Sequence, residues 1–533
     1  MVLVMGIALV AACRAGAAEV KEGVVEVPKP PRTDGLGLMA WSPQGDAALV
    51  RQHGEYLDKR TLLGGRQGYL LSAWFVLDAK TGKVASLCRA HDCAWMPDGR
   101  LLARGYAPFD AQDIETLSFG AGPQGNRAVS TLLERDGRVA ATLATQAIEC
   151  VPSPDAKRFL ITQEPAGRNN YGCLRKLVVE TLGGQAKTLP LPIEERPGRL
   201  VGYRYGGRWL GPDRFRISLV DMDAKEAARA MPGMWLGVEP QWFDYVFANG
   251  AKGAWEKLAG EALDDARAEH YPLPAGEGEA PAEPSGEVLV RPGRIDVLKA
   301  GRRSTLLWPE AKDLEITVRA ASADGTRLFV SLKENEVGLP GGGRDGGPGA
   351  SPGAPGGAAP PQAKPQVGYY ALNVPKSTKV RLSLEPRAIW NSSFSVCCYL
   401  EDGALLIIPD DGPAATADEA TGKLSSLAVP GFPWPKFIIT RWAGPARDCT
   451  GRGQPMGSGR VGVLARQARF VQTPHAIAVF RGKEAAGCLA IPEGFPLGDR
   501  SYLHWSPDGS ALAVTSQDGT RVWLTRAMPK TAF

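Results

Sequence analysis

The sequence predicts an all-β fold, a single β-propeller of seven or eight four-stranded blades. Three observations predict it. A turn motif recurs along the chain, apolar hairpins follow its copies, and the 533 residues include 64 glycines and 43 prolines. Many short strands joined by tight turns use that much glycine and proline, whereas long helices do not tolerate it. With 44% hydrophobic residues, the chain can bury a large core.

The turn motif has the form Trp-Ser-Pro-Asp-Gly. Proline presets the first central φ angle, aspartate bonds to its own backbone, and glycine accepts a positive φ. The aspartates are therefore predicted to be structural, and the preceding aromatic residue is predicted to pack between neighbouring blades. Clear copies begin at Trp41, Trp95 and Trp505, and weaker copies begin at Pro152, Trp209, Ser322 and Leu400.

The spacing of the turns sets the expected number of blades. The first four turns, at Pro43, Pro97, Pro154 and Pro212, are 54, 57 and 58 residues apart. Compact blades repeat at about 40 to 50 residues. Later intervals are longer, and the last has room for one degenerate blade, so seven clear turns predict seven or eight blades. The last blade lacks a fourth strand, which residues 24–27 are predicted to supply.

Two stretches interrupt the repeat. Residues 222–287 combine an aromatic-rich part with helical spacing in residues 254–270, which predicts a partly helical insertion. Because loops on a rigid scaffold commonly carry specificity, this stretch is the predicted partner surface. The alternative is that its aromatic residues bury the helix against the propeller. Residues 338–366 are almost wholly Gly, Pro and Ala, which predicts a disordered loop.

These motifs resemble the WD40-like propeller repeat of the TolB family and of the N-terminal propellers of prolyl oligopeptidases. The resemblance covers most of residues 19–533 and implies a propeller used in periplasmic or extracellular protein interaction. The sequence departs from prolyl oligopeptidases because no residues follow the last repeat that could form a hydrolase domain.

Residues 1–18 predict export. Residues 2–12 form an apolar run of signal-peptide length, too short to span a membrane, and small residues at 15–18 suit a signal peptidase. The alternative is a lipoprotein signal that ends before Cys13, because residues 10–13 look like a lipobox. A buried N-terminal strand is a third interpretation. The predicted location is periplasmic or extracellular, with Cys13 as the site of a lipid anchor in the second case.

Eight cysteines follow Cys13, and an even number in an oxidising compartment favours disulfides over metal ligands. A metal site at Cys88, His91 and Cys93 is the alternative to a local disulfide there. The adjacent Cys397 and Cys398 are predicted to be two separately packed thiols, with a vicinal disulfide as the alternative. The predicted disulfide cysteines are Cys88, Cys93, Cys150, Cys173, Cys449 and Cys488, and two pairings, Cys150 with Cys173 and Cys449 with Cys488, fall within single blades.

The charge pattern argues against nucleic acid. The formal net charge is +5, from 62 basic and 57 acidic side chains, without a block of five or six like charges. Proteins that bind nucleic acid concentrate basic side chains on one face. The five histidines lack zinc-binding spacing. No catalytic residue, metal or cofactor is predicted.

The sequence predicts a noncatalytic scaffold that binds a protein or an envelope component, with carbohydrate as a further partner. The alternative is a hydrolase or lyase acting on carbohydrate or peptide at the central channel, and an envelope lipoprotein is a third. Mixed aromatic and basic side chains can stack on sugars or hold acidic groups, although a solvated strand pair explains them equally well. The predicted binding residues are Tyr203, Arg204, Tyr205, Arg208, Trp235, Trp242 and Tyr245.

Overall fold

The computed structural model describes most of the predicted propeller. The described residues are 20–30, 33–54, 72–90, 92–106, 130–145, 149–163, 176–184, 186–194, 196–223, 239–247, 253–273, 286–334, 366–384, 394–400, 402–409, 413–427, 429, 442–443, 461–464, 477–482, 485–497, 501–506 and 511–526.

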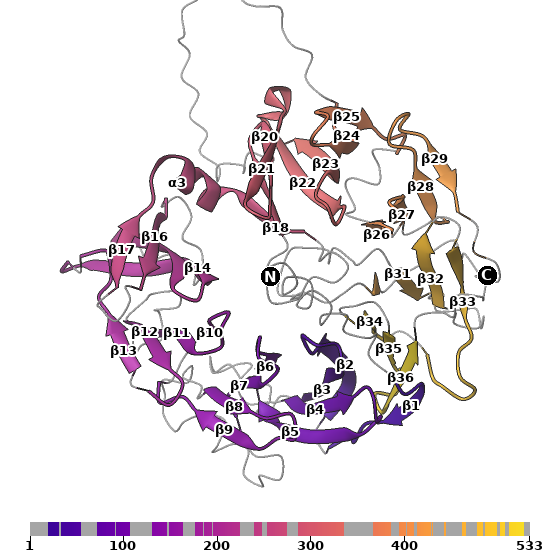
Figure 1. The fold of residues 1–533 in the computed structure, drawn as a ribbon, viewed down its shortest axis with the longest axis horizontal. Coiled ribbons are helices and arrows are strands. Elements are labelled where there is room, and N and C mark those ends of the chain that lie inside the picture. Colours follow the sequence, from indigo (N-terminus) through magenta and orange to yellow (C-terminus); the bar gives the residue numbers. More distant parts are fainter. Residues whose placement is uncertain are drawn as a thin grey trace, which may run out of the picture.

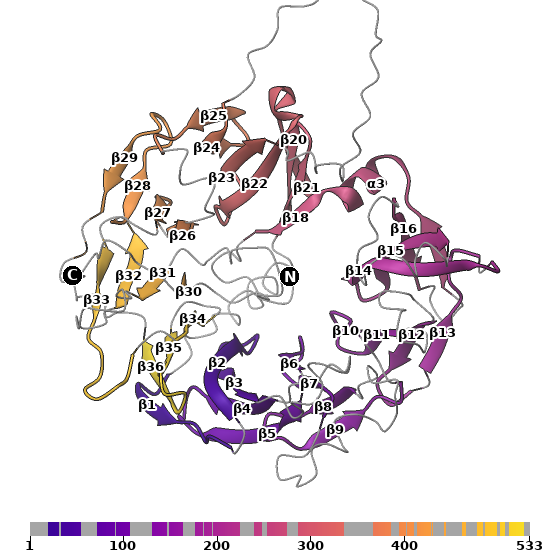
Figure 2. The ribbon, with the colours of Figure 1, turned by 180° about the vertical axis from the view of Figure 1, so that it is seen from behind.

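Nine four-stranded antiparallel sheets surround a common centre, so the described chain is a β-propeller (Figures 1 and 2). In each of the first eight sheets the chain runs from the innermost strand to the outermost and then passes to the next blade. The predicted fold class and four-stranded blades are confirmed. The number of sheets is nine, above the seven or eight expected.

Blades 1 to 3 follow the predicted repeat closely. From the centre outward, blade 1 contains β2 (Thr33–Trp41), β3 (Ala47–Gly54), β4 (Ser72–Asp78) and β5 (Val84–Ala90), blade 2 contains β6 (Asp92–Trp95), β7 (Leu101–Arg104), β8 (Ser130–Leu133) and β9 (Val139–Thr142), and blade 3 contains β10 (Glu149–Pro152), β11 (Arg158–Gln163), β12 (Lys176–Thr181) and β13 (Ala186–Leu189).

Blades 4 to 6 include the helix α3 (Gly260–Arg267), which connects blade 4 to blade 5, and the short helix η2 (Pro309–Ala311), which connects blade 5 to blade 6. Blade 4 contains β14 (Arg199–Gly211), β15 (Arg214–Asp223), β16 (Gln241–Val246) and β17 (Ala254–Lys257), blade 5 contains β18 (Glu269–Pro272), β19 (Glu287–Arg291), β20 (Arg294–Lys299) and β21 (Arg302–Leu307), and blade 6 contains β22 (Leu314–Ala321), β23 (Arg327–Glu334), β24 (Gly368–Asn373) and β25 (Thr378–Arg381).

Blades 7 to 9 complete the ring. Blade 7 contains β26 (Phe394–Tyr399), β27 (Leu405–Pro409), β28 (Ala415–Ala417) and β29 (Leu424–Ser426), blade 8 contains β30 (Trp442–Ala443), β31 (Val461–Leu464), β32 (Ile477–Gly482) and β33 (Ala485–Leu489), and blade 9 contains β34 (Leu503–Trp505), β35 (Ala511–Thr515), β36 (Arg521–Arg526) and β1 (Gly23–Glu26).

The ring closes as the sequence predicts. β1 is the outermost strand of blade 9 and pairs antiparallel with β36, so that Val25 lies opposite Val522. Val20 and Val27, which flank β1, are 2% and 3% exposed and pack with side chains of blades 1 and 9. The first described residues and the last strand are therefore held in one sheet.

The sequence did not predict blade 5, because that blade lacks the turn motif. Residues 222–287 contain a helix, as predicted, but they also contribute β16 and β17 to blade 4 and β18 to blade 5. The stretch is therefore largely part of two blades and not a separate insertion. In blade 5 the connection between β18 and β19 spans residues 273–286, whereas a tight turn joins the first two strands of blades 1 to 4, 6 and 7, so no motif marks blade 5.

The repeated turns make the hydrogen bonds that their chemistry predicts. In blade 3 the Ser153 hydroxyl donates to the Asp155 carboxylate at 2.5 Å and accepts the Arg158 N–H at 2.9 Å. Ser322 bonds in the same way to Asp324 and to the N–H of Arg327 in blade 6. Burial would raise the pKa of Asp324, but the hydrogen bonds from Ser322 and Thr326 outweigh it and lower that pKa. Asp155 and Asp324 therefore bond within their own hairpins.

The motif tryptophans connect neighbouring blades. The indole N–H of Trp41 donates to the carbonyl of His504 in blade 9 at 3.2 Å, and that of Trp95 donates to the carbonyl of Ala40 in blade 1 at 3.3 Å. Trp209 of blade 4 donates to the carbonyl of Val151 in blade 3 at 3.0 Å. The predicted packing between blades is confirmed for these three residues.

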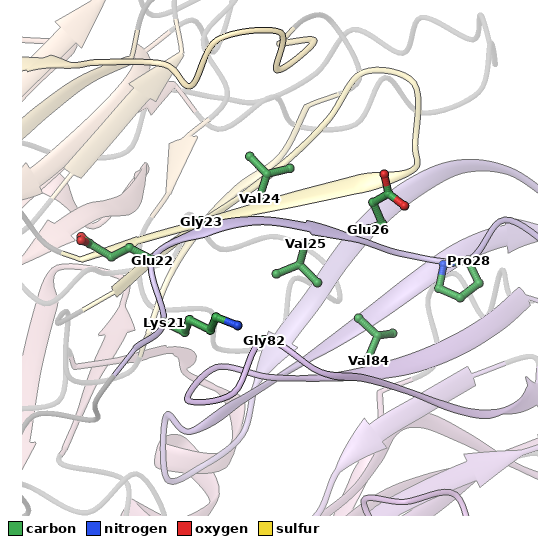
Figure 3. Close-up of a pocket in the computed structure, with 9 residues that line it drawn as sticks. All are labelled: Lys21, Glu22, Gly23, Val24, Val25, Glu26, Pro28, Gly82 and Val84. Carbon is green, nitrogen blue, oxygen red and sulfur yellow. The ribbon is translucent and has the colours of Figure 1, made fainter.

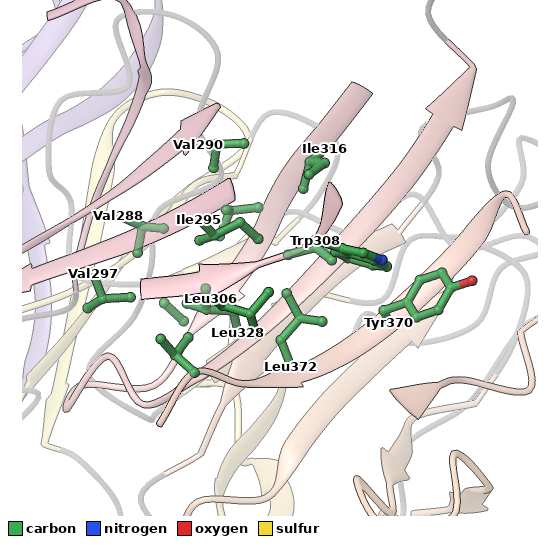
Figure 4. Close-up of a cluster of buried hydrophobic side chains, with 14 of the residues drawn as sticks. Val288, Val290, Ile295, Val297, Leu306, Trp308, Ile316, Leu328, Tyr370 and Leu372 are labelled. Atoms are coloured by element: carbon green, nitrogen blue, oxygen red, sulfur yellow. The ribbon is translucent and has the colours of Figure 1, made fainter. Parts of the chain in front are cut away.

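Apolar side chains fill the space between most neighbouring blades. Eight clusters of buried residues lie at eight of the nine blade junctions. Figure 4 shows the cluster between blades 5 and 6, where the Trp308 ring meets that of Tyr370 edge to face at 5.0 Å. Among the described residues, no such cluster joins blades 4 and 5. None of the described helices is long and apolar enough to cross a membrane.

The Trp209 hydrogen bond is predicted to stabilise the ring. Trp209→Phe keeps a ring beside Phe247 but removes the indole N–H that the Val151 carbonyl accepts, and such a hydrogen bond contributes about 0.5–1.5 kcal/mol. Chemical unfolding should show a loss of this size. Trp255→Phe is the matched control, because the Trp255 bond to the Pro190 carbonyl is exposed and water replaces it. An equal loss in both variants would contradict the prediction.

Candidate functional site: the polar seam

The facing sides of blades 4 and 5 form a polar seam, and this is the one junction at which no apolar cluster is present among the described residues. Strand periodicity explains it. In β15, Phe215, Ile217 and Leu219 face blade 3, so Arg214 and Arg216 face blade 5. In β20, Ile295 and Val297 face blade 6, which turns Asp296 toward blade 4. The seam therefore collects charged side chains from both blades.

An ionic triad crosses the seam at the inner strands. Arg208 on β14 donates from Nη2 to the Glu287 carboxylate at 3.0 Å, and His270 on β18 lies with Nδ1 2.9 Å from the same oxygen, Oε2. The Arg208 Nη1 atom lies 3.3 Å from His270 Nδ1. Arg208 is 48% exposed, whereas His270 and Glu287 are 28% and 23% exposed. The triad is half-buried and open to solvent on one side.

The electrostatics of the triad favour the ionised carboxylate. Burial alone would raise the pKa of Glu287, but the hydrogen bond from His270 and the positive charge of Arg208 outweigh burial and lower the pKa from 4.5 to about 2. With Nδ1 of His270 engaged by Glu287, its Nε2 is the ring nitrogen that remains for a ligand.

A second ionic network attaches helix α3 to both blades. Arg267 in its last turn pairs with Glu239 of blade 4, and Asp265 pairs with Arg291 and Arg303 of blade 5. Arg291 and Arg303 also pair with the fully buried Asp296 of β20. The helix therefore bridges the seam by charge.

Blade 4 carries its own buried carboxylate on the seam. Asp244 of β16 is 0% exposed and accepts from Arg214 at 2.9 Å and from Arg216 at 2.8 Å. Removing a partner from a buried ion pair is strongly destabilising, because it leaves a charge uncompensated. These contacts fix the arginines that line the blade 4 side of the seam.

The predicted binding residues fall into three groups. Arg208 and Trp242 lie on the seam side of blade 4, and Leu210, two residues after Arg208 on β14, is 40% exposed. Tyr245 is 2% exposed and packs against Phe215 on the other side of the blade, in the apolar cluster between blades 3 and 4. The backbones of Tyr203, Arg204 and Tyr205 form part of β14, and Trp235 lies outside the described residues.

Sequence reasoning missed His270 and Glu287. They lie 17 residues apart on strands that no turn motif connects, and only their antiparallel pairing brings them together. No group of His, Cys, Asp and Glu suited to a metal ion occurs among the described residues. The predicted loop 338–366 lies almost entirely outside those residues. A match to Gly-x-Ser-x-Gly, the nucleophile pattern of α/β-hydrolases, occurs at residues 349–353 and also lies outside them.

The cysteines are free where the structure describes them. Cys397 and Cys398 face opposite sides of β26 and join different apolar clusters, so the prediction of two separately packed thiols is confirmed. Cys88 and Cys93 are buried in one cluster with their thiols hydrogen-bonded. Cys150 and Cys488 are also free, and Cys13, His91, Cys173 and Cys449 lie outside the described residues.

The solved structures similar to this chain match it at low identity and low TM-score. No family model matches the sequence, and no curated protein matches it. The C-terminal WD40 domain of Sif2 is similar at 9% identity over 96% of this chain and 100% of that one, with a TM-score of 0.35. Dipeptidyl peptidase 4 of Porphyromonas gingivalis is similar at 10% identity over 93% of this chain and 58% of that one, with a TM-score of 0.33. The β-propeller domain of the Trilobed protease from Pyrococcus furiosus gives 9% identity, 75% and 100% coverage, and a TM-score of 0.28.

The triad is predicted to make stability depend on pH. The pKa of Glu287 is about 2 in the folded chain against an ordinary value of 4.5, so its stabilisation is fully present above about pH 4.5 and is lost as the pH falls toward 2. Glu287→Gln should lower the free energy of unfolding at pH 7 by about 2 kcal/mol and flatten its decline below pH 4.5. Urea unfolding at several pH values measures both. Parallel curves for the two proteins would show that Glu287 contributes nothing to the pH dependence.

Proposed function

We propose that the chain is an exported, noncatalytic propeller that binds a protein or an envelope component through the polar seam. The observation that carries the proposal is the triad at the seam, where charged side chains stay partly solvated beside the exposed Leu210. Rim charges around a small apolar contact are typical of surfaces that recognise a partner reversibly. Carbohydrate is the further partner class, since the guanidinium of Arg208 can donate hydrogen bonds to hydroxyl groups.

Export is compatible with the way the ring closes. Val20, two residues beyond the predicted leader 1–18, is 2% exposed in the closure cluster, and the Lys21 N–H donates to the Ala79 carbonyl. Cleavage after residue 18 would therefore leave β1 and its contacts intact. The alternative lipid anchor at Cys13 would leave them intact too, and the intact mass of the mature protein distinguishes the two forms.

In an oxidising compartment, Cys88 and Cys93 are predicted to form a disulfide during folding. Their thiols are already in contact, and oxidation releases two protons while two electrons reduce the disulfide of a donor such as glutathione disulfide. The protein purified from its native compartment should resist alkylation at both residues until it is reduced. Cys397 and Cys398, which pack apart, are the internal control and should be alkylated once the chain is denatured. Mass spectrometry that finds Cys88 and Cys93 alkylated without reduction would contradict the prediction.

The seam is tested by placing a photo-cross-linking benzophenone side chain at Leu210. Val139 on the outer strand of blade 2 is the matched control site, because it is 42% exposed against 40% for Leu210. In cells of the native host, a discrete adduct should form from position 210, and Arg208→Ala should reduce its yield several-fold. Adducts of equal yield from both positions, or none from position 210, would contradict the proposed binding surface.

A deletion that tests binding near the seam has to leave the strands of blades 4 and 5 in place. Removing residues 222–287 would delete two strands of blade 4 and one of blade 5, so loss of binding would report loss of the fold. Removing residues 224–238 spares every described strand.

The hydrolase or lyase alternative rests on one observation, the pairing of His270 with Glu287. A histidine oriented by a carboxylate through Nδ1 can move a proton at Nε2, which is the arrangement of a general base. Screening glycans and peptides for turnover by the mature protein tests it. Activity that His270→Ala abolishes and Val139→Ser leaves unchanged would replace the scaffold proposal with an enzymatic one.

A further inference from the structure

The closure strand β1 has an open edge. β1 ends the sheet order of blade 9 and pairs only with β36 among the described strands. The Val27 N–H donates to the Thr520 carbonyl of blade 9, and N–H groups two residues apart point the same way, so Val25 also faces β36. The N–H and C=O groups of Val24 and Glu26 therefore point away from the sheet, as a further strand would require.

A groove of about 530 Å³ runs beside this edge (Figure 3). It is lined by residues 21–26 and Pro28 on one side and by Gly82 and Val84 of blade 1 on the other. Gly82 has φ +69°, and a Cβ atom there would reach within 3.5 Å of Val25 and Lys21. The positive φ is what favours glycine at this turn, which lies close to the β1 side of the groove.

The side chains along β1 alternate between two faces. Lys21 and Val25 point toward Gly82 and Val84 in the groove, whereas Val24 and Glu26 point the other way (Figure 3). Val24 is 40% exposed and is one of the few large apolar side chains of the described residues to be so exposed. The edge therefore offers an apolar centre with Glu26 at one end and Lys21, beside Glu22, at the other.

We propose that β1 binds an extended peptide by strand addition, antiparallel to β1. The peptide would carry a basic residue opposite Glu26, apolar residues opposite Val25 and Val24, and an acidic residue opposite Lys21. Backbone hydrogen bonds to Val24 and Glu26 supply affinity, and the alternating side chains supply specificity. Opposite charges paired across neighbouring strands stabilise this register, and like charges oppose it. This surface is separate from the polar seam.

The probe is the fluorescein-labelled peptide Lys-Val-Val-Thr-Thr-Glu, measured by fluorescence anisotropy with the mature protein. A peptide with the terminal charges exchanged, Glu-Val-Val-Thr-Thr-Lys, should bind at least fivefold more weakly. The double variant K21E/E26K should reverse that preference, because it exchanges the charges of the strand. No saturable binding of the first peptide, or equal binding of both peptides by wild type, would overturn the proposal.

Val24→Pro tests strand addition itself. It removes an outward N–H that β36 does not use, and proline is tolerated on edge strands at such positions. Binding should fall at least tenfold while the melting temperature stays close to that of wild type. Val139→Ser, which removes an equally exposed valine on blade 2, should bind as wild type does. If Val24→Pro unfolds the ring, the charge exchange decides, and peptide binding unaffected by a folded Val24→Pro would overturn the proposal.

Discussion

The structure depends on apolar packing between neighbouring blades. A four-stranded blade has two faces, and an apolar face is stable only when another layer covers it. At eight of the nine junctions the described residues form a buried apolar cluster, and each cluster draws on side chains from two consecutive blades. No blade is therefore complete alone, and the ring must close. β1 provides the closure by adding the outermost strand of blade 9.

The polar seam departs from this rule in a way that suits recognition. Apolar burial contributes about 25 cal/mol for each Å² of surface removed from water, whereas exposed ion pairs contribute at most about 1 kcal/mol each. Charged groups such as Arg208 also keep their hydration when they are half exposed. The half-exposed guanidinium of Arg208 therefore loses less than a buried apolar side chain when a ligand or water enters the seam. This difference makes the seam the junction most able to adapt to a partner.

Local chemistry determined what the sequence could predict. The turn around Pro154 and Asp155 is held by hydrogen bonds between residues that are close in sequence. Sequence patterns therefore predicted the repeat, the four-stranded blades and the closing strand. Blade 5 was missed because residues 273–286 replace its turn. Arg208 was predicted from its basic and aromatic neighbours, but its partners His270 and Glu287 were not, because ion pairs between blades depend on strand register. Tyr245 looked like a binding residue until its register placed it among Phe215 and Phe247.

The two proposed surfaces lie on opposite sides of the ring, since the seam separates blades 4 and 5 while β1 lies between blades 9 and 1 (Figure 1). Four blades, 1 to 4, separate them in one direction and five blades, 5 to 9, in the other. The junctions that separate them on either side are filled by close-packed apolar side chains, which deform little. A change at the seam would need to alter several such clusters before it reached β1. Binding at the two surfaces is therefore expected to be independent, and a scaffold with two independent surfaces can hold two partners at a fixed separation.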